Sequence, residues 1–587
     1  MKGVRGMNLP EFLRAVDAAT ARITPEQLAD FIHQQARQLP AEHRERYLGE
    51  LRSRVSGKAP ETPAAPDNTE LLNRLRLIAE GELCLSSEYN EEYDDWNGDD
   101  EDEFLIEDPH DIADTVSRSM EAAHQYVASG AYEEGLRLGQ TLLNLNITVE
   151  GDYTDYSDEP FGIGDLADYD MVPDYDALLR RLYVDMLVAV YFLRSGDGRC
   201  AELYTLFEWY GEEDGLNLEQ VMTGSSRELP DFPAFLPQWT DYLGGKTGTT
   251  ADRLIAEAVA LSGDPETWKN AASRFANTHP GLYERLLRGN PDGMEDRQLL
   301  SIGQEALREI RPDIRLRSNV ALLTAACALR LDDRDEAERC WLEALRSEPN
   351  ATNYLRLCVE SRDIPRSQEA AHAICGTYHA GGKLPGVFSS YDKSENAVFQ
   401  VSDSMRCSLA FLEQDFLFVQ KRGMSVDAGL GWSSTFVNQG LALFLLYLYQ
   451  GEKLDKGTAW VCVLAAAAME FDADRYCEAL LRDTEESELQ VFWEVFRAWR
   501  ESHLCEEAKQ ADLLREMERL VDLRLEGIMS ANRRNYYDEC AAYIAALAEV
   551  KASRGEVSGK QEVLRAYKDR YSRRRAFHQE LRHFGMK

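Results

Sequence analysis

Apolar residues recur along most of the chain at the three-to-four-residue spacing of helices with one buried face. Near the start, Phe12, Leu13 and Val16 follow this spacing. Thr24 to Gln27 then has the Thr-x-x-Gln form of a capping box, with Pro25 at the first helical position. Runs that alternate apolar and polar residues, as strands do, are rare. The pattern therefore predicts an all-α chain, and we expect no sheet.

Several predicted helix pairs are separated by short turns. In the segment 120–146, apolar positions lie on both sides of a turn that contains Gly130. Two short helices joined in this way form an αα-hairpin. Looser versions of the pattern occupy residues 182–209, 458–481 and 535–577.

The plainest hairpin runs from Ser318 to Pro349. Its second helix carries a set of residues at offsets 0, +4, +7 and +12, namely Ala337, Trp341, Ala344 and Pro349. These offsets match a tetratricopeptide repeat, in which small residues let two helices approach, an aromatic residue fills the space between repeats and proline ends the unit. Helix pairs that bury a face only against their neighbours stack into a solenoid. We therefore expect an all-α, tetratricopeptide-like helical-repeat solenoid.

Two acidic segments interrupt the hairpins. Residues 88–111 contain thirteen Asp and Glu with no Lys or Arg, and residues 152–176 contain nine more. Charge at this density repels itself and resists burial. Both segments are expected to be solvated loop insertions between helices.

Composition also divides the chain into segments. Three prolines within residues 57–66, without an apolar period, are typical of an extended linker. We expect a small N-terminal helical segment at residues 1–56 and the linker at 57–70. Helical hairpins with the acidic insertions follow at 71–245 and tetratricopeptide-like repeats at 246–385. C-terminal helical repeats that end in a basic hairpin occupy 386–587.

The net charge narrows the classes of function. The 587 residues include 65 Lys and Arg against 103 Asp and Glu, a formal charge of −38, which disfavours binding of the whole molecule to nucleic acid or to an anionic membrane. The longest apolar runs, 441–449 and 459–469, are shorter than the roughly 18 residues of a spanning helix. The eleven cysteines show no paired spacing, which indicates reduced thiols and not a disulfide framework. We expect a cytoplasmic protein with no membrane partner and no cofactor.

Three stretches in the first third of the chain occur together. They are an acidic, Tyr-rich stretch that ends near Asp111, the hairpin 128–136, and an acidic loop that contains Gly162 to Leu166. With the stretches 533–537 and 573–581, they resemble the helical-repeat region that accompanies SWIM zinc fingers in bacterial proteins. The finger itself needs Cys-x-Cys and Cys-x-His, and this chain contains neither. The resemblance implies a bacterial relative that keeps the helical repeats and lacks the zinc site.

Few residues suggest chemistry. His372, Cys375 and His379 have a His-x2-Cys-x3-His spacing that places three possible metal ligands along one helix. No fourth ligand is apparent nearby, so a packed cysteine with hydrogen-bonded histidines is the favoured interpretation and a metal site is the alternative. Two glycines precede Lys246, as in part of a phosphate loop, but the earlier glycine of that motif is absent. We therefore expect a turn between helices at this position. No residue is identified as catalytic.

The C-terminus reverses the sign of the charge. Residues 551–587 contain eleven Lys and Arg and four Asp and Glu. The favoured interpretation is a terminal hairpin whose basic face lies against acidic loops of the same chain, and binding to an acidic partner or to RNA is the alternative. The candidates for partner binding are residues of its basic and apolar faces, Arg573, Arg574, Arg575, Tyr567 and Tyr571.

These observations favour a non-catalytic scaffold or adaptor. Helical repeats supply extended surface, and their function depends on what that surface holds. A protein partner is therefore expected. The alternatives are a nucleic-acid-associated regulator that uses the basic C-terminal hairpin, and an enzyme whose site has no recognisable motif.

Overall fold

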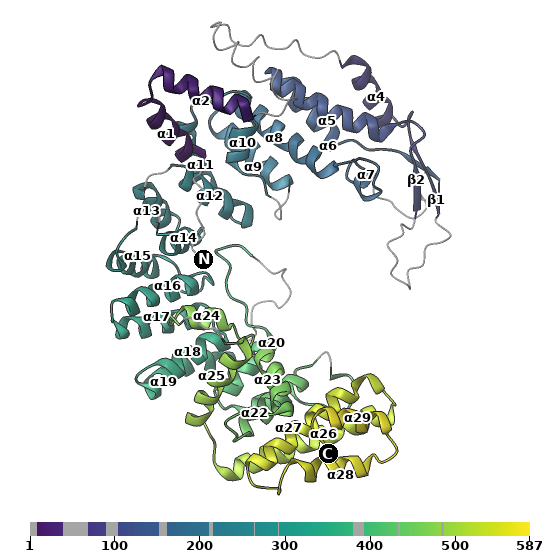
Figure 1. Cartoon of the computed structure of the whole chain (residues 1–587), viewed down its shortest axis with the longest axis vertical. Helices are drawn as coiled ribbons and strands as arrows, with labels where there is room; N and C mark the ends of the chain where they lie inside the picture. The colour runs from purple at the N-terminus through teal and green to yellow at the C-terminus, as the bar shows by residue number, and fades with distance from the viewer. Residues whose placement is uncertain are drawn as a thin grey trace. The chain divides into compact units, whose positions relative to one another are not determined.

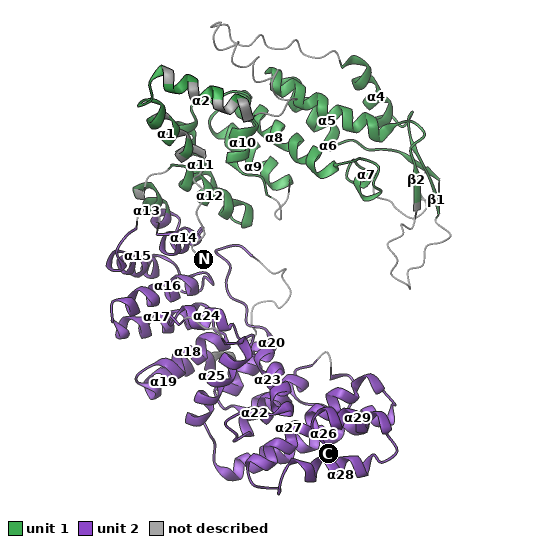
Figure 2. Cartoon of the chain, in the orientation of Figure 1, with its two compact units in different colours: residues 1–271 green, residues 272–587 purple. Residues whose placement is uncertain are grey.

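The computed structural model of the chain is predominantly helical (Figure 1). Its contacts divide the chain into two units, residues 1–271 and 272–587, which are described separately (Figure 2). The predicted linker at 57–70 lies almost entirely outside the described residues, and the finer segments expected from composition stay a prediction. The structure describes residues 9–38, 68–89, 104–151, 161–210, 215–262, 265–290, 293–379, 393–432, 435–482 and 486–586.

Unit 1 begins with the helices α1 (Leu9–Thr20) and α2 (Pro25–Gln38). The Thr24 N–H donates to Gln27 Oε1 at 3.0 Å and the Gln27 N–H donates to Thr24 Oγ1 at 3.3 Å, so the predicted capping box is confirmed. The elements that follow are α4 (Thr69–Ala79), β1 (Leu85–Tyr89), β2 (Phe104–Glu107), α5 (Ile112–Ser129), α6 (Tyr132–Leu143), β3 (Val149–Gly151), α7 (Asp165–Asp168), α8 (Tyr175–Leu193), α9 (Gly196–Trp209), α10 (Leu218–Gly224), α11 (Phe232–Gly244), α12 (Thr249–Ser262) and α13 (Pro265–Arg274), which crosses the boundary between the units.

The predicted hairpin at 120–146 is confirmed as the pair α5 and α6. Gly130 ends α5 in the left-handed region at φ 85°, a conformation that glycine adopts without a steric penalty. Its backbone N–H and that of Ala131 bond back to carbonyls of α5. The glycine therefore stops the first helix and lets the chain reverse.

The expectation that the chain has no sheet is wrong. Strand β1 pairs antiparallel with β2 and parallel with β3, which gives the order β2-β1-β3. The strands are three to five residues long, and the buried positions of β1 are Leu85 and Ser87. With a serine at an inward position, the alternation that marks a strand is not visible in the sequence.

The acidic segments are not simply solvated insertions. Strand β2 and part of β1 lie within 88–111. In the second segment, Phe161, Ile163 and Leu166 are buried, and Phe161 forms a β-bridge with Ile147. The carboxylates raise the average polarity of these segments, whereas a few apolar residues between them supply enough burial to fold the described parts.

Unit 2 holds the hairpin expected at 318–349. Trp341 is fully buried on the second helix between Ala337 and Ala344, which are also fully buried, and Pro349 follows the helix. The hairpin is confirmed, and the stacking of such hairpins into a solenoid stays a prediction. The elements of unit 2 are α14 (Gly281–Gly289), α15 (Asp296–Glu309), α16 (Arg317–Arg330), α17 (Arg334–Ser347), α18 (Ala351–Glu360), α19 (Ile364–His379), α20 (Asp403–Leu412), α21 (Phe416–Phe418), the π-helix η3 (Val419–Gly423), α22 (Val437–Leu448), α23 (Lys456–Ala468), α24 (Ala473–Glu478), α25 (Glu488–Ser502), α26 (Glu507–Ser530), the 3-10 helix η5 (Arg534–Tyr536), α27 (Tyr537–Ser553), α28 (Lys560–Arg570) and α29 (Arg575–His583).

The start of α23 packs directly on α27. A Cβ atom added to Gly457 would lie 2.3 Å from the backbone nitrogen of Ala546, so no larger residue fits there without a shift. The buried Glu549 carboxylate accepts hydrogen bonds from the N–H groups of Gly457 and Thr458, at 3.1 and 2.7 Å. Lys560 Nζ of α28 donates to the same carboxylate at 3.0 Å. One carboxylate thus joins three helices.

Candidate binding groove

Unit 2 contains a groove of about 760 Å³ between α18, α24 and α25. The end of α18 forms one wall, α24 and the residues after it form the second, and α25 forms the third. The lining residues are Val359, Glu360, Tyr476, Cys477, Arg482, Glu486, Val491, Glu494, Val495 and Ala498.

The sequence of α25 gives this helix two apolar faces. Its start is fixed by Ser487, whose Oγ accepts a hydrogen bond from the Gln490 N–H at 3.3 Å. Val491, Val495 and Ala498 follow at i, i+4 and i+7, so they form one stripe along the groove. The large aromatics Phe492, Phe496 and Trp499 occupy the other face and are fully buried. The core therefore takes the large side chains, and the small ones line the floor of the groove, where Val491 and Val495 are also buried and Ala498 is exposed.

A hydrogen-bonded ion pair forms the polar wall. The Glu360 carboxylate, 13% exposed, accepts two hydrogen bonds from the Arg482 guanidinium, at 2.7 and 3.0 Å. It accepts a third from the Tyr476 hydroxyl at 2.9 Å. Burial, with this carboxylate nearby, raises the pKa of Tyr476 well above its usual value, so the hydroxyl remains a donor. Three donors compensate the charge of Glu360.

Two further carboxylates lie at the rim of the groove. Glu486 and Glu494 are both exposed, and Glu494 accepts a hydrogen bond from Gln490 at 2.9 Å. The lining residues include three glutamates and one arginine, so their summed formal charge is negative. Leu481, beside Arg482, is 45% exposed and has φ 56°, a conformation that costs a bulky side chain about 1–3 kcal/mol.

The two described side chains of the possible metal site, His372 and Cys375, differ in exposure and in their partners. Cys375 is fully buried, and burial raises the pKa of its thiol well above the usual value, which opposes the thiolate that a metal needs. His372 on the same helix is exposed, and its Nδ1 lies 2.5 Å from the Glu413 carboxylate. The side chain of His379 lies outside the described ones. These contacts agree with a packed cysteine and a hydrogen-bonded histidine.

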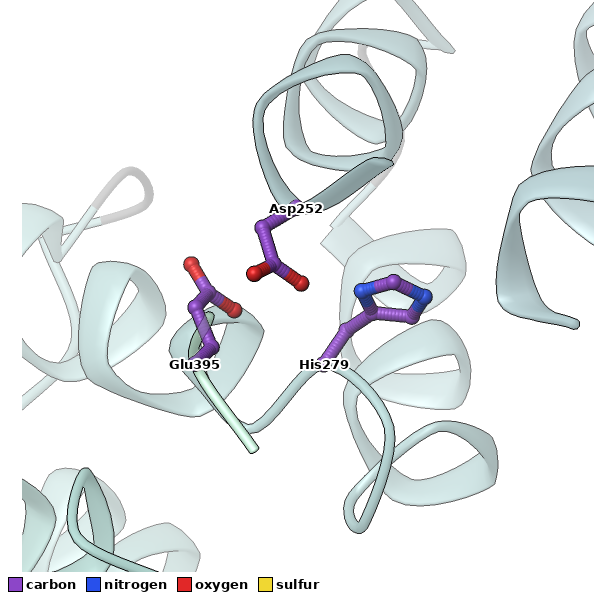
Figure 3. A group of neighbouring side chains, drawn as sticks. All are labelled: Asp252, His279 and Glu395. Carbon is purple, nitrogen blue, oxygen red and sulfur yellow. The ribbon is translucent and has the colours of Figure 1, made fainter. Parts of the chain in front are cut away.

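Neither unit, taken by itself, has three described His, Cys, Asp or Glu side chains whose ligand atoms lie within 4.8 Å of one another. Figure 3 shows His279 and Glu395 of unit 2, and also Asp252, which belongs to α12 of unit 1. Glu395 accepts a hydrogen bond from the Gly281 N–H at 2.8 Å and pairs with Arg285 at 2.9 Å. Within unit 2, the Glu395 carboxylate therefore caps the start of α14.

The C-terminal candidates separate into buried and exposed groups. Tyr567 is buried and donates to the Asp522 carboxylate at 2.9 Å, and Tyr571 packs edge-on against Phe577. Arg574 donates to Asn532 at 2.6 Å and to the Met529 carbonyl. Arg573 and Arg575 are exposed. Several other cations of this region are paired within unit 2: Lys551 with Glu518, Arg554 with Glu556, Lys560 with Glu549 and Asp455, and Arg570 with Asp522.

Lys246 lies in the turn after α11, as expected, and its ammonium group lies 4.9 Å from the centre of the Tyr242 ring.

The groove was not predicted. Its lining residues extend from 359 to 498, and only the small residues on one face of α25 could have suggested it.

No family model matches the chain, and no curated protein matches it. No described helix is both long and apolar enough to cross a bilayer.

Proposed function

We propose that this chain is a non-catalytic adaptor that binds a segment of a protein partner in the groove of unit 2. The observation that supports this most directly is an open groove of about 760 Å³, in which Ala498 is exposed and Val491 and Val495 form a floor that is 7% and 6% exposed. A partner that covers apolar surface still exposed there, such as that of Ala498, gains about 25 cal/mol per Å² of that surface. The polar wall is satisfied within the chain, as expected for a surface that positions a partner and does not catalyse a reaction.

Site-specific photo-crosslinking tests the proposal. A benzophenone amino acid replaces the exposed Ala498, and the matched control carries it at Arg515, whose side chain is 76% exposed on α26 and does not line the groove. After irradiation in the source cells, mass spectrometry identifies the crosslinked peptides. One partner segment captured at 498 and not at 515 supports the proposal. Equal capture at both positions, or none at 498, contradicts it.

The alternative of nucleic-acid binding has one observation in its favour. Arg573, Arg575 and Arg582 are exposed on the last hairpin. A heparin column run with the full chain and with a variant in which these three residues are alanine separates the two functions. Retention that the substitution abolishes supports the nucleic-acid alternative, whereas no retention of the full chain supports the adaptor.

A further inference from the structure

We propose that two copies of this chain associate through the exposed face of α23, packed antiparallel about a two-fold axis beside Val463. The proposal does not depend on the groove or on its partner segment. It rests on the apolar residues that α23 exposes and on the symmetric order of these residues and of the charges at their two ends.

Helix α23 is apolar on its exposed side as well as on its buried side. It packs against α22, α25 and α27, and its buried residues include Val461, Cys462 and Ala465. Val463 is 53% exposed, and Ala467 is exposed too. A helix at the surface of a protein ordinarily carries polar residues on its outer face. The outer face of α23 therefore has the composition of a contact surface.

The residues of this face form one patch. At about 100° per residue, they all lie within about 60° of Val463 around the helix. Trp460 is half-buried, because its ring packs edge-on against Tyr543 of α27 with the ring centres 5.1 Å apart. The patch consists of Ala459, Trp460, Val463, Ala466 and Ala467.

Charged residues bound the patch at its two ends and do not interrupt it. Lys456 and Glu470 are exposed, and no charged residue lies between them in the chain. Lys456 is the first residue of the helix, and its Nζ donates to the His583 carbonyl at 2.8 Å. Glu470 follows the last turn. Each is seven residues from Val463, about two turns of helix, so opposite charges lie at equal distances from the centre of the patch.

This order is complementary to itself. A two-fold axis beside Val463 makes two such helices antiparallel and places residue 463+n of one copy level with residue 463−n of the other. Each Val463 then meets its counterpart, and Lys456 lies level with Glu470 of the second copy. A parallel pair would instead bring like charges together. The charges therefore favour the antiparallel arrangement, which forms the Lys456–Glu470 contact twice.

The sizes of the side chains agree with this arrangement. Trp460 of one copy lies beside Ala467 of the other, so a large residue meets a small one. The alanines let two helix axes approach to about 8–10 Å. Contact between two single helices is smaller than the roughly 1,200–2,000 Å² of a standard interface, so we expect a dimer that dissociates at about micromolar concentration.

Sedimentation velocity of the full chain tests the proposal, between about 1 and 100 µM and in about 150 mM salt, which screens the repulsion between two acidic chains. We expect a species of twice the chain mass of 66.5 kDa that increases with concentration. Val463→Glu puts two like charges together and should weaken association at least about tenfold. The matched control is Leu331→Glu, at a position 40% exposed in the turn before α17, which should leave association within about twofold.

Charge reversal tests the antiparallel arrangement. Glu470→Lys places lysine level with lysine at both ends of the patch and should weaken association about fivefold or more. Lys456→Glu should have the same effect through its glutamates. The double variant restores opposite charges and should return association to within about twofold of the unmodified chain. A residue that only stabilised its own copy would not give this recovery.

Disulfide trapping identifies what covers the patch. Mild oxidation of Val463→Cys should link two copies through position 463, whereas Leu331→Cys should give no such link. Capture of position 463 by another segment of the same chain would overturn the proposal. A monomer over the whole concentration range, a dimer that Val463→Glu leaves unchanged, or no recovery in the double variant would overturn it as well.

Discussion

Arg482 and Glu360 join two walls of the groove through a pair of hydrogen bonds, at 2.7 and 3.0 Å. They are 122 residues apart in the chain, one at the end of α18 and the other just after α24. Because the Tyr476 hydroxyl donates to the same carboxylate, removal of Glu360 leaves both this hydroxyl and the Arg482 guanidinium without their acceptor. The pair therefore connects the end of α18 to the segment after α24 in the lining of the groove.

Glu360→Ala should lower the free energy of unfolding by about 1–3 kcal/mol, because the Tyr476 hydroxyl loses its partner in a buried setting. Urea denaturation measures the change. Tyr476→Phe combined with Glu360→Ala should cost less than the sum of the two single substitutions. Full additivity would show that this hydrogen bond contributes nothing to stability.

Trp341→Ala should cost about 3–5 kcal/mol, because it opens a cavity between helices where Ala337 and Ala344 cannot fill the space. The matched control is Leu331→Ala in the turn of the same hairpin, where the side chain is 40% exposed and the cost should be below about 1 kcal/mol. Thermal and urea unfolding measure both variants. Equal costs would contradict a packing role for Trp341.

His124 and Asp185 should make the stability of unit 1 depend on pH. The hydrogen bond to the Asp185 carboxylate, 3.0 Å long, raises the pKa of His124 above 6.5, and partial burial opposes this. The pKa of His124 is higher in the folded state than in the unfolded state, so its pairing with Asp185 stabilises the fold fully below pH 6.5. This stabilisation is lost as the pH rises through the pKa of the folded state. The difference in melting temperature between the unmodified chain and His124→Gln should therefore be larger at pH 6 than at pH 9. An equal difference in melting temperature at pH 6 and at pH 9 would contradict a stabilising role for the pair.

Thiol reactivity should follow burial. Burial raises the pKa of Cys340, Cys462 and Cys540 to about 12, which suppresses the reactive thiolate. Cys84 and Cys505 are only partly buried. Labelling with iodoacetamide followed by mass spectrometry should modify these two before the other nine, which should react only on unfolding. Early labelling of Cys540 would contradict the packing of α27.

The C-terminal hairpin should remain docked when salt is raised. Phe577 and Leu581 of α29 are fully buried, so apolar contact holds the hairpin, and salt does not screen such contact. Hydrogen exchange of residues 560–583 should be equal at low and high salt. Phe577→Ala should increase it, whereas Arg573→Ala and Arg575→Ala together should not. Release by salt alone would favour electrostatic docking.

Local features were the most predictable from the sequence. The capping box at Thr24 and the turn at Gly130 each depend on a few adjacent residues, and both are present as expected. The strands escaped prediction because Ser87 occupies an inward position of β1. The acidic segment at 152–176 was misjudged because Phe161 and Leu166 are few among many carboxylates, and yet they are buried.

The groove could not be predicted because it depends on distant parts of the chain. Val359, Tyr476 and Val495 come from three helices, and no spacing in the sequence relates them. The interpretation of Cys375 as a packed residue could be made from the apolar residues around it, and the structure agrees with that interpretation. The partner preferences of Arg573 and Arg575 stay predictions.

The contact at Gly457 has a mechanical consequence for the last third of unit 2. With the backbone of α23 in contact with that of α27, these helices cannot slide past each other without first moving apart. A force that pulls on α28 is transmitted through Lys560 and Glu549 to the first turn of α23. In a single-molecule pulling experiment, the C-terminal helices should therefore yield together with α23 in one step, and a substitution of Gly457 by alanine should divide that step into two.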